Sequence, residues 1–347
     1  MRKIFVFIMM ICGVGFTSCS DNVDRVYDDM STPCEISMSV NKAEAGEFKF
    51  NLFRDAYLGA LVDWISWGDG KEEKPGSMSV YSHNFEAGTY TIVVQGRGSV
   101  LLWIAEKELT ALDLSKCTVL TELQCSAGKF TSLDLNNCEK ITTVVCNAAL
   151  TSLNVNNCEN LTSLDCSKNQ LTELPALPAS LTSLICSKNK LTSLDLTSYK
   201  DLTSVTCADN QLADLKILSV VTTLDCSGNK LKTLDVSANE KLTSLACAKN
   251  ELTSLKVCTS NKVLARLTSI TCGTNQLTEL DLSNCRALVT VSFEDNLMDK
   301  DAVDAIYSKL YETTNSKAIV TVYGNKSVGT PSIATEKGWT VVTEKKK

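Results

Sequence analysis

Leucine and cysteine residues recur at fixed spacings through the middle of the chain, with polar residues between them. The clearest stretch is Leu161-Thr-Ser-Leu-Asp-Cys-Ser-Lys-Asn-Gln-Leu171, and a near copy begins at Leu181. A second stretch, such as Thr192-Ser-Leu-Asp-Leu196, completes a unit of about 21 residues. Self-similarity at this period predicts a solenoid, in which each turn buries its apolar side against the neighbouring turns.

We predict that the solenoid spans residues 99–298 and contains ten turns. The leucines and the cysteine alternate with polar residues, so each turn contributes one short strand with its apolar side inward, and the strands stack into a parallel sheet. Pro175 and Pro178 replace the second strand of one unit, because proline has no amide hydrogen to donate to a sheet. The turns begin at Ser99, Leu120, Ile141, Leu161, Leu181, Leu202, Val221, Leu242, Leu267 and Leu288.

The spacing L-x-x-L-x-C-x-x-N-x-L resembles the leucine-rich repeat of bacterial proteins. The resemblance covers more than half of the chain and implies a mainly β fold, a leucine-rich repeat solenoid with a parallel sheet. An asparagine recurs where the chain leaves each strand. Its amide carries donors and an acceptor, so we expect it to satisfy backbone groups of its own turn and of the neighbouring turn. The members are Asn169, Asn189, Asn210, Asn229, Asn250 and Asn275.

Residues 34–98 differ from the repeat and predict a small β-sandwich that covers the N-terminal end of the solenoid. Residues 35–40 and 47–53 alternate with the strand period. The motifs Trp67-Gly-Asp-Gly and His83-x-Phe-x-x-Gly-x-Tyr resemble a PKD domain, an immunoglobulin-like sandwich. The resemblance implies a tight turn at residues 68–70, Trp67 and Tyr90 in the core, and a structural role for His83.

The repeat pattern decays after Leu288, and residues 299–347 predict a C-terminal α/β cap. Residues 299–311 have apolar positions at helical spacing, and residues 318–323 and 339–342 predict strands around a turn at Gly324 and Asn325. Such a cap would cover the apolar residues and unpaired strand edge at the open end of a solenoid.

The sequence predicts a lipoprotein signal peptide at residues 1–18 and a flexible tether at residues 19–33. Arg2 and Lys3 precede an apolar stretch. The segment that ends at Cys19 resembles the lipobox of bacterial lipoproteins, which implies that Cys19 is acylated. An ordinary secretory signal with a bystander cysteine is the alternative. The acidic tether resembles the signal that sends lipoproteins of the Bacteroides group to the cell surface. We therefore expect a surface-exposed outer membrane lipoprotein, with a periplasm-facing orientation as the alternative.

The charge of the chain argues against a nucleic-acid partner. The net charge is −6, and removal of Arg2 and Lys3 with the signal would take it to −8, since residues 1–18 contain no acidic residue. Phosphate binding requires clustered Lys and Arg. No later apolar run approaches the roughly 20 residues of a membrane helix, so the lipid would be the only membrane attachment.

Most of the sixteen cysteines follow the repeat and are predicted to be buried free thiols. Stacked cysteine side chains point the same way, which is poor geometry for a disulfide and suits a small packing residue. The inward slot holds Cys125, Cys146, Cys166, Cys186, Cys207, Cys226, Cys247 and Cys272. A second slot holds Cys117, Cys138, Cys158 and Cys285.

The sequence contains no recognisable catalytic or cofactor-binding set. It has one histidine, His83, no C-x-x-C pair and no phosphate-binding glycine loop. We therefore predict a non-enzyme without cofactor or metal. A column of aspartates after the third leucine could hold calcium between turns, but Asn154, Pro175, Lys216 and Lys256 interrupt it, which favours a solvated edge. The column is Asp113, Asp134, Asp195, Asp235 and Asp281.

The exposed face of the sheet is the predicted place of function. Strand alternation puts one residue of every turn in a central row, and a partner site is predicted in its N-terminal half, since only Trp103 is a typical interface anchor. The site comprises Trp103, Gln124, Val145, Asp165 and Ile185. We expect a monomeric, non-catalytic binding module for a protein or glycan at the cell surface. The alternative is a structural spacer or envelope component without a specific ligand.

Overall fold

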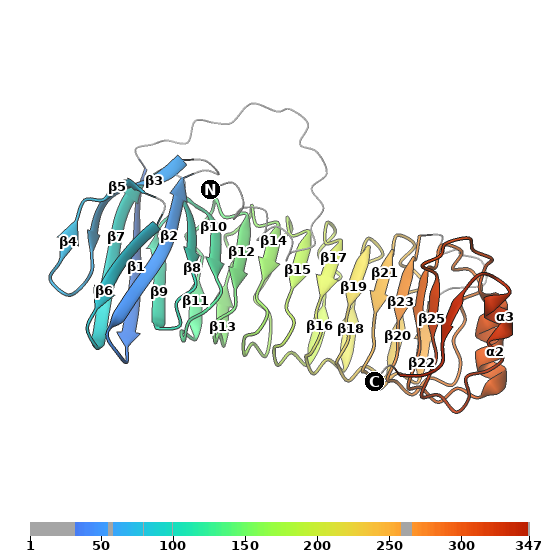
Figure 1. Cartoon of the computed structure of the whole chain (residues 1–347). Helices are drawn as coiled ribbons and strands as arrows, with labels where there is room; N and C mark the ends of the chain where they lie inside the picture. Colours follow the sequence, from blue (N-terminus) through green and yellow to red (C-terminus); the bar gives the residue numbers. More distant parts are fainter. Residues whose placement is uncertain (1–31, 55–57, 79, 99, 258–265, 346–347) are drawn as a thin grey trace.

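The computed structural model describes residues 32–54, 58–78, 80–98, 100–257 and 266–345. Figure 1 shows an elongated molecule with a sandwich at one end, a stack of short strands in the middle and two helices at the other end. The predicted signal peptide and Cys19 lie outside the described residues. Within these ranges, no helix is long and apolar enough to cross a membrane.

The main sheet contains twelve parallel strands, and the first ten are those predicted from the repeat. Neighbouring strands pair in register, so that Leu164 lies beside Leu184 and Leu184 beside Val205. The predicted parallel-sheet solenoid is therefore confirmed. The strands are β8 (Val100–Ile104), β10 (Leu120–Cys125), β12 (Thr143–Cys146), β14 (Ser163–Asp165), β15 (Ser183–Ile185), β17 (Ser204–Thr206), β19 (Thr223–Asp225), β21 (Ser244–Ala246), β23 (Ser269–Thr271), β24 (Thr290–Ser292), β25 (Ile319–Thr321) and β26 (Thr340–Val342).

A second set of strands forms the opposite side of the solenoid, and six of them pair two by two. The turn that contains Pro175 and Pro178 contributes none of them, as predicted. The strands are β9 (Leu109–Lys116), β11 (Ser132–Asp134), β13 (Ser152–Asn154), β16 (Ser193–Asp195), β18 (Asp214–Lys216), β20 (Thr233–Asp235) and β22 (Ser254–Lys256). Parallel pairs join β11 to β13, β16 to β18, and β20 to β22.

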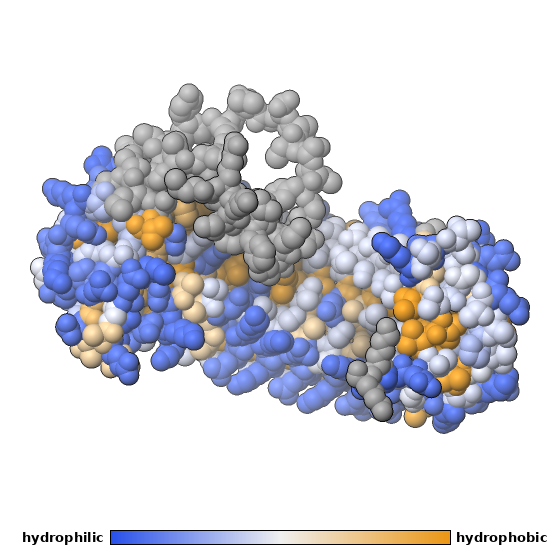
Figure 2. All heavy atoms as spheres, viewed as in Figure 1, coloured by the Kyte–Doolittle hydropathy of each residue, from blue (hydrophilic) through white to orange (hydrophobic). Residues whose placement is uncertain are grey.

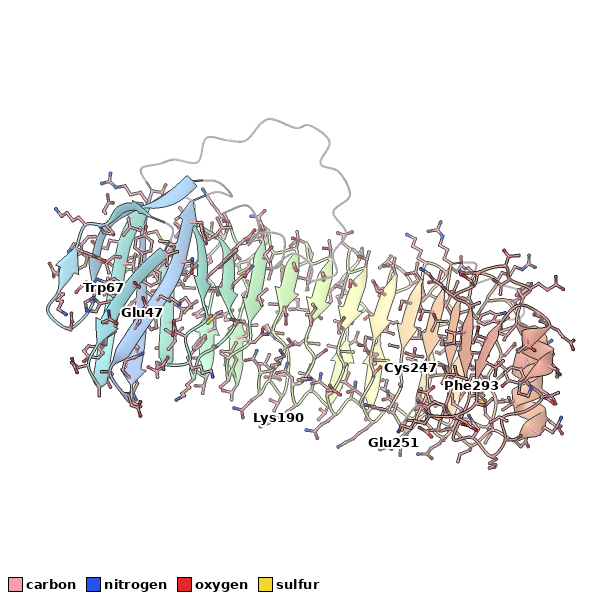
Figure 3. All side chains as sticks on the ribbon, in the orientation of Figure 1. Glu47, Trp67, Lys190, Cys247, Glu251 and Phe293 are labelled. Carbon is pink, nitrogen blue, oxygen red and sulfur yellow. A yellow bond between two sulfur atoms is a disulfide. The ribbon has the colours of Figure 1, made fainter. Side chains whose placement is uncertain are left out.

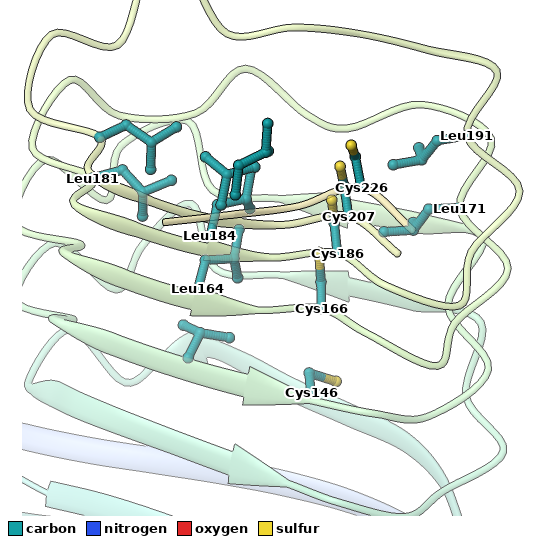
Figure 4. Packing of buried hydrophobic residues seen from close by; sticks show 14 of the residues in the cluster. Cys146, Leu164, Cys166, Leu171, Leu181, Leu184, Cys186, Leu191, Cys207 and Cys226 are labelled. Atoms are coloured by element: carbon teal, nitrogen blue, oxygen red, sulfur yellow. The ribbon is translucent and has the colours of Figure 1, made fainter. Parts of the chain in front are cut away.

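The inward leucines and cysteines form one continuous core. Figure 4 shows Cys166, Cys186, Cys207 and Cys226 stacked above one another with leucines on both sides. All eight cysteines of the inward slot are buried and free, as predicted. Phe293 takes this slot in the turn of β24 and is fully buried (Figure 3). Burial raises the pKa of Cys186 and of Cys226 to about 12, so these thiols are protonated packing groups.

From Asn169 onward, the asparagine ladder ties each turn to the one before it, as predicted. Asn189 Nδ2 donates to the carbonyl oxygen of Cys186 in its own turn (3.0 Å) and to that of Cys166 in the preceding turn (2.9 Å). Its Oδ1 accepts the amide hydrogen of Leu171 (3.0 Å). The residue before the asparagine has a left-handed backbone, for example Lys188 with φ 57°. The same pattern repeats at Asn210, Asn229, Asn250, Asn275 and Asn296.

A threonine ladder, which the sequence analysis did not identify, joins the turns along the start of the main strands. Thr142 Oγ1 donates to the carbonyl oxygen of Thr121 (3.1 Å), and Thr162 to that of Thr142 (3.2 Å). Each such bond contributes about 1 kcal/mol. These hydroxyls therefore serve the stacking of the turns. The ladder continues through Thr182, Thr203, Thr222, Thr243 and Thr268.

The C-terminal segment continues the main sheet, which corrects the predicted strand–turn–strand arrangement. Helix α2 (Lys300–Lys309) lies at the predicted position, with Asp299 capping its first turn. β25 pairs parallel to β24, and β26 parallel to β25, with α3 (Ser332–Thr335) between them in the chain. Gly324 (φ 74°) and Asn325 repeat the left-handed residue and the ladder asparagine, because Asn325 Nδ2 donates to the carbonyl oxygen of Phe293 (2.9 Å).

The N-terminal end is an antiparallel sandwich packed on aromatic side chains. Trp67 and Tyr81 are buried and contact Phe50, with ring centroids 6.1 and 5.3 Å away. Tyr90 is partly buried and lies 4.4 Å from the ring of Phe85. The strands are β1 (Pro33–Lys42), β2 (Gly46–Arg54), β3 (Leu58–Ser66), β4 (Glu72–Glu73), β5 (Gly76–Met78), β6 (Val80–Phe85) and β7 (Gly88–Arg97).

Both sides of the sandwich join the solenoid by strand pairing. β2 pairs antiparallel with β8, which puts Asn51 beside Trp103, and β8 pairs parallel with β10. On the other side, β1 pairs antiparallel with β9. The first turn of the solenoid therefore has no unpaired strand edge toward the sandwich, and one face runs without interruption from β2 to β26.

A disulfide joins Cys34 to Cys117, which corrects the prediction that Cys117 is a free thiol. The antiparallel register that pairs Glu35 with Lys116 brings the next residues of β1 and β9 together, with Cα atoms 4.4 Å apart. The partner comes from the sandwich and not from the stack, so the stacking geometry did not exclude it. Cys138 and Cys158, in the same slot of later turns, remain free and buried.

We predict that the double substitution Cys34→Ser and Cys117→Ser lowers the free energy of unfolding by roughly 2–5 kcal/mol, because this bond closes a loop with a sequence separation of 83 residues. Urea unfolding of the oxidised wild type and of the double variant measures the difference.

Alkylation gives the control. In denatured protein that has not been reduced, the reagent should modify the inward cysteines but neither Cys34 nor Cys117. Modification of Cys34 or Cys117 at the level of Cys166 would contradict the bond.

Candidate functional site

The five predicted site residues lie in one row on the exposed side of the main sheet, here called the front face. Strand register places Trp103 beside Gln124, Gln124 beside Val145, Val145 beside Asp165, and Asp165 beside Ile185. All five are half-buried. The row continues through Thr206, Asp225, Ala246, Thr271 and Ser292. The predicted row is confirmed as a structural feature, and its role in binding stays a prediction.

Trp103 occupies the junction between sandwich and solenoid. Its ring meets the ring of Phe53 from β2 edge-on, with centroids 5.0 Å apart. The indole Nε1 is buried without a hydrogen-bond partner among the described residues. The part of the Trp103 side chain that reaches solvent is therefore ring carbon. The sequence analysis missed Phe53, because nothing in the repeat indicates that β2 lies beside β8.

Glu122 adds a carboxylate to this region that the sequence analysis did not name. It lies on β10, two residues before Gln124 and therefore on the same face, beside Leu101 of β8. Its carboxylate has no hydrogen bond or ion pair within the described ranges, and burial raises the pKa of Glu122. Strand alternation around Gln124 would have identified it.

Asp165 differs from its neighbours in the row because its carboxylate already has partners. Its Oδ1 accepts the amide hydrogen of Ser167 (2.9 Å) and lies 3.4 Å from Asn147 Nδ2. Asp225 accepts the amide hydrogen of Ser227 in the same way (3.0 Å). These two acids contribute negative charge to the front face while they fix the end of their strands.

The front face carries no basic side chain on its twelve parallel strands. Each strand has two outward positions, such as Glu122 and Gln124 on β10, and none of these twenty-four positions holds Lys or Arg. The basic residues lie elsewhere, and Figure 3 shows Lys190 on the turn edge. Figure 2 shows hydrophilic residues gathered along that lower edge.

The aspartate column fixes turns on the opposite side of the solenoid. Each carboxylate accepts the amide hydrogen of the residue two positions later, at 2.9–3.1 Å. The hydroxyl group of that same residue, and to a lesser degree this amide bond, lower the pKa of Asp195, Asp235 and Asp281. Lys216 and Lys256, which interrupt the column, approach Asp195 (3.4 Å) and Asp235 (3.8 Å). Among the described residues, no group of three or more His, Cys, Asp or Glu could hold a metal.

Two hollows lie away from the front face. One of about 230 Å³ is lined by Leu174, Pro175 and Tyr199, where the turn lacks its second strand. The other, of about 470 Å³, lies at the disulfide. The charges around it are already paired, since Lys116 contacts Glu35 (2.6 Å) and Arg97 contacts Asp63 (2.8 Å). Neither hollow contains an arrangement suited to catalysis.

His83 is part of the sandwich core. Its ring stacks on Trp67 with centroids 4.8 Å apart, and its Nε2 lies 2.9 Å from Asp69 Oδ2. Asp69 belongs to the predicted tight turn, in which Gly68 and Gly70 have left-handed φ values of 81° and 87°. A side chain at Gly68 would place its Cβ 2.4 Å from the carbonyl oxygen of Thr91. The Trp67 motif thus serves the turn and the core.

No protein-family model and no curated protein matches the chain. Among solved structures, it is similar to the functional domain of InlJ from Listeria monocytogenes, which includes a cysteine ladder, with 29% identity over 70% of this chain and 51% of that chain and a TM-score of 0.56. It is also similar to a leucine-rich repeat protein from Bacteroides thetaiotaomicron, with 15% identity over 67% of this chain and 32% of that chain and a TM-score of 0.50.

The chain spans about half of the InlJ structure and a third of the Bacteroides protein. These similarities show a leucine-rich repeat fold with bacterial neighbours. The fold predicted from the sequence is confirmed at that level.

The pairing of Asp69 with His83 predicts a pH dependence of stability. Burial raises the pKa of Asp69, but the bonds from His83 and Lys71 outweigh it and lower this pKa from 3.8 to about 2. The unfolded chain therefore binds the proton first as the pH falls, so the stabilisation is complete above about pH 4 and is lost toward pH 2. Thermal unfolding of wild type should lose more stability between pH 4 and pH 2 than unfolding of Asp69→Asn. Equal slopes for the two proteins would contradict this assignment.

Proposed function

We propose that the chain is a non-catalytic binding module that presents the front face of its leucine-rich repeat sheet to a protein or glycan partner. The observation that carries this proposal is the variation of the central row within a nearly constant repeat. The inward leucines and cysteines, the asparagine ladder and the threonine ladder repeat because each turn needs them. The central row changes from Trp103 to Gln124, Val145, Asp165 and Ile185 in register. Its residues are thus set by something other than stacking.

The chemistry of the described residues supports a module without catalysis. The inward cysteines are buried, and burial raises the pKa of the Cys186 and Cys226 thiols, which makes them poor nucleophiles. His83 is engaged by Trp67 and Asp69. Leucine-rich repeat proteins are typically protein-binding scaffolds, which favours a protein as the partner.

A structural spacer is the second candidate, and the threonine ladder favours it. The hydroxyl groups of Thr142, Thr162 and Thr182 donate to the preceding turn. The threonine hydroxyls at the beginning of the strands therefore contribute to the length and rigidity of the array. A spacer would need no variation in the central row, and the presence of Trp103 in that row favours binding.

The proposed location is the outer face of the outer membrane, with acylated Cys19 as the anchor and residues 20–33 as a tether. Cys19 and most of the tether lie outside the described residues, so this proposal rests on the sequence. An N-terminal anchor suits the fold, because β1 begins at Pro33 and is bonded through Cys34 to the first turn of the solenoid. A tether that ends at Pro33 would then carry the sandwich and the solenoid together, because the disulfide joins them.

The front-face proposal predicts the effect of Val145→Arg on partner capture from envelope or host extracts. A long charged side chain in the central row should reduce capture of a specific partner at least about tenfold, by steric and charge conflict with the bound surface. Quantitative mass spectrometry of the captured proteins, and a labelled glycan array, provide the measurement.

Lys190→Glu, on the turn edge, is the matched control and should leave capture unchanged. Circular dichroism confirms that both variants fold. Capture that neither Val145→Arg nor Thr271→Arg alters would contradict the proposal and favour the spacer.

The location proposal predicts that Cys19→Ala moves the protein out of the mature membrane-bound form. Acyl chains hold a protein on a membrane at about 0.8 kcal/mol per buried methylene, so the variant should appear in the soluble fraction or as an unprocessed precursor. Cell fractionation with immunoblotting measures this, and Cys12→Ala is the control that should change nothing. Protease added to intact cells should remove the wild-type body, whereas a membrane-bound body that resists it would indicate a periplasm-facing lipoprotein.

A further inference from the structure

At the junction between sandwich and solenoid, the aromatic residue of the central row, Trp103, lies beside a second aromatic residue, Phe53. Phe53 and Trp103 come from different parts of the fold, and their rings touch edge to face at 5.0 Å across the β2–β8 pairing. Both side chains are half-buried. Because the indole Nε1 is buried, Trp103 offers solvent a π surface and no donor. Such a surface suits a flat or cationic group better than a ligand that requires a hydrogen bond from the indole.

Glu122 supplies a carboxylate beside this π surface that lacks a cation. It lies on the strand next to β8, in the row of Leu101 and Phe53. No described Lys or Arg pairs with it, and Gln124, beside Trp103, has no hydrogen bond from its side-chain amide within the described ranges. A half-buried carboxylate without a partner is costly, so a cation supplied from outside would be bound favourably. We call Phe53, Trp103, Glu122 and Gln124 the junction site.

The negative charge of the front face favours a positively charged ligand. Its twelve parallel strands present Glu122, Asp165 and Asp225 outward and no Lys or Arg. On the sandwich side, Lys49 of β2 lies two rows away from Glu122 and pairs with Glu47 at 4.0 Å. The face therefore complements a basic surface and repels an acidic one.

We propose that the junction site binds an arginine side chain of a protein partner, with its guanidinium stacked on Trp103 and hydrogen-bonded to Glu122. This inference rests on the proposed function and assigns the partner class for that face. Arginine fits better than lysine, because a planar guanidinium stacks on an aromatic ring and donates in its own plane at the same time. Its edge can reach the carboxylate of Glu122 and the amide oxygen of Gln124 together. A neutral glycan would leave the carboxylate of Glu122 without a counter-charge.

The test uses the full chain labelled with 5-fluorotryptophan, which gives one fluorine signal for each of its four tryptophans. Trp103→Phe assigns the signal of Trp103. The probe is an acetylated tri-arginine amide at physiological salt, and the matched probe is its tri-citrulline analogue, which has the same shape without charge. Tri-arginine should shift the Trp103 signal and leave those of Trp64, Trp67 and Trp339 in place. Tri-citrulline should cause no shift at the same concentrations.

Glu122→Gln keeps the shape of the site and removes its charge. It should raise the apparent dissociation constant for tri-arginine roughly tenfold. Asp225→Asn, on the same face but in the central row and without an aromatic neighbour, should change this constant by less than about twofold. An unmoved Trp103 signal, or equal binding by Glu122→Gln, would overturn the proposal. A shift caused by maltohexaose and not by tri-arginine would assign a glycan instead. If the junction site fails to bind tri-arginine but Val145→Arg still loses partner capture, the arginine assignment is overturned and the front-face function stays in place.

Discussion

From the turn of Asn169 onward, the stacking of the array depends on one asparagine side chain in each turn. Asn189 bonds the carbonyl oxygens of Cys186 and Cys166 and the amide of Leu171, so its bonds exist only when two turns are stacked. A single turn would leave these buried groups without partners, at about 1–3 kcal/mol each. The left-handed backbone at Lys188 adds a cost of about 1 kcal/mol that the same bonds offset. Stacking is therefore cooperative, and each end of the array must be completed by something else.

The two ends of the array complete their hydrogen bonds and strand pairing in different ways. At the N-terminal end, β2 and β1 pair with β8 and β9, and the bond between Cys34 and Cys117 fixes the arrangement. At the C-terminal end, Asn325 continues the ladder by bonding Phe293, and α2 and α3 pack behind the last strands. At both ends the added strands pair with the main sheet, which explains why the front face continues beyond the repeat in both directions.

The sequence predicts most of what depends on neighbouring turns, although the threonine ladder, which also repeats from turn to turn, was missed. The strands, the inward cysteines, the asparagine ladder and the front row all follow from a period of about 21 residues, and the structure contains them. It could not predict contacts between the sandwich and the solenoid, because β2 and β8 are joined by register and share no motif. Phe53 beside Trp103 and Cys34 beside Cys117 are both of this kind. The sequence analysis places two strands around a turn at Gly324 and Asn325, although the same dipeptide at Gly228 and Asn229 lies at the exit turn of a repeat.

Along the front face, positions that stacking explains can be told apart from positions that it does not explain. A position that repeats in every turn is explained by the bond it makes to the next turn, as for Thr162 and Asn189. A position that changes from turn to turn, or that carries a group without a partner, lacks that explanation. Trp103 and Glu122 have both properties and lie where the repeat meets a different fold. A repeat array gives every turn a similar surface by default. The proposed binding function therefore points to positions where that similarity is broken, and at the junction two different folds meet.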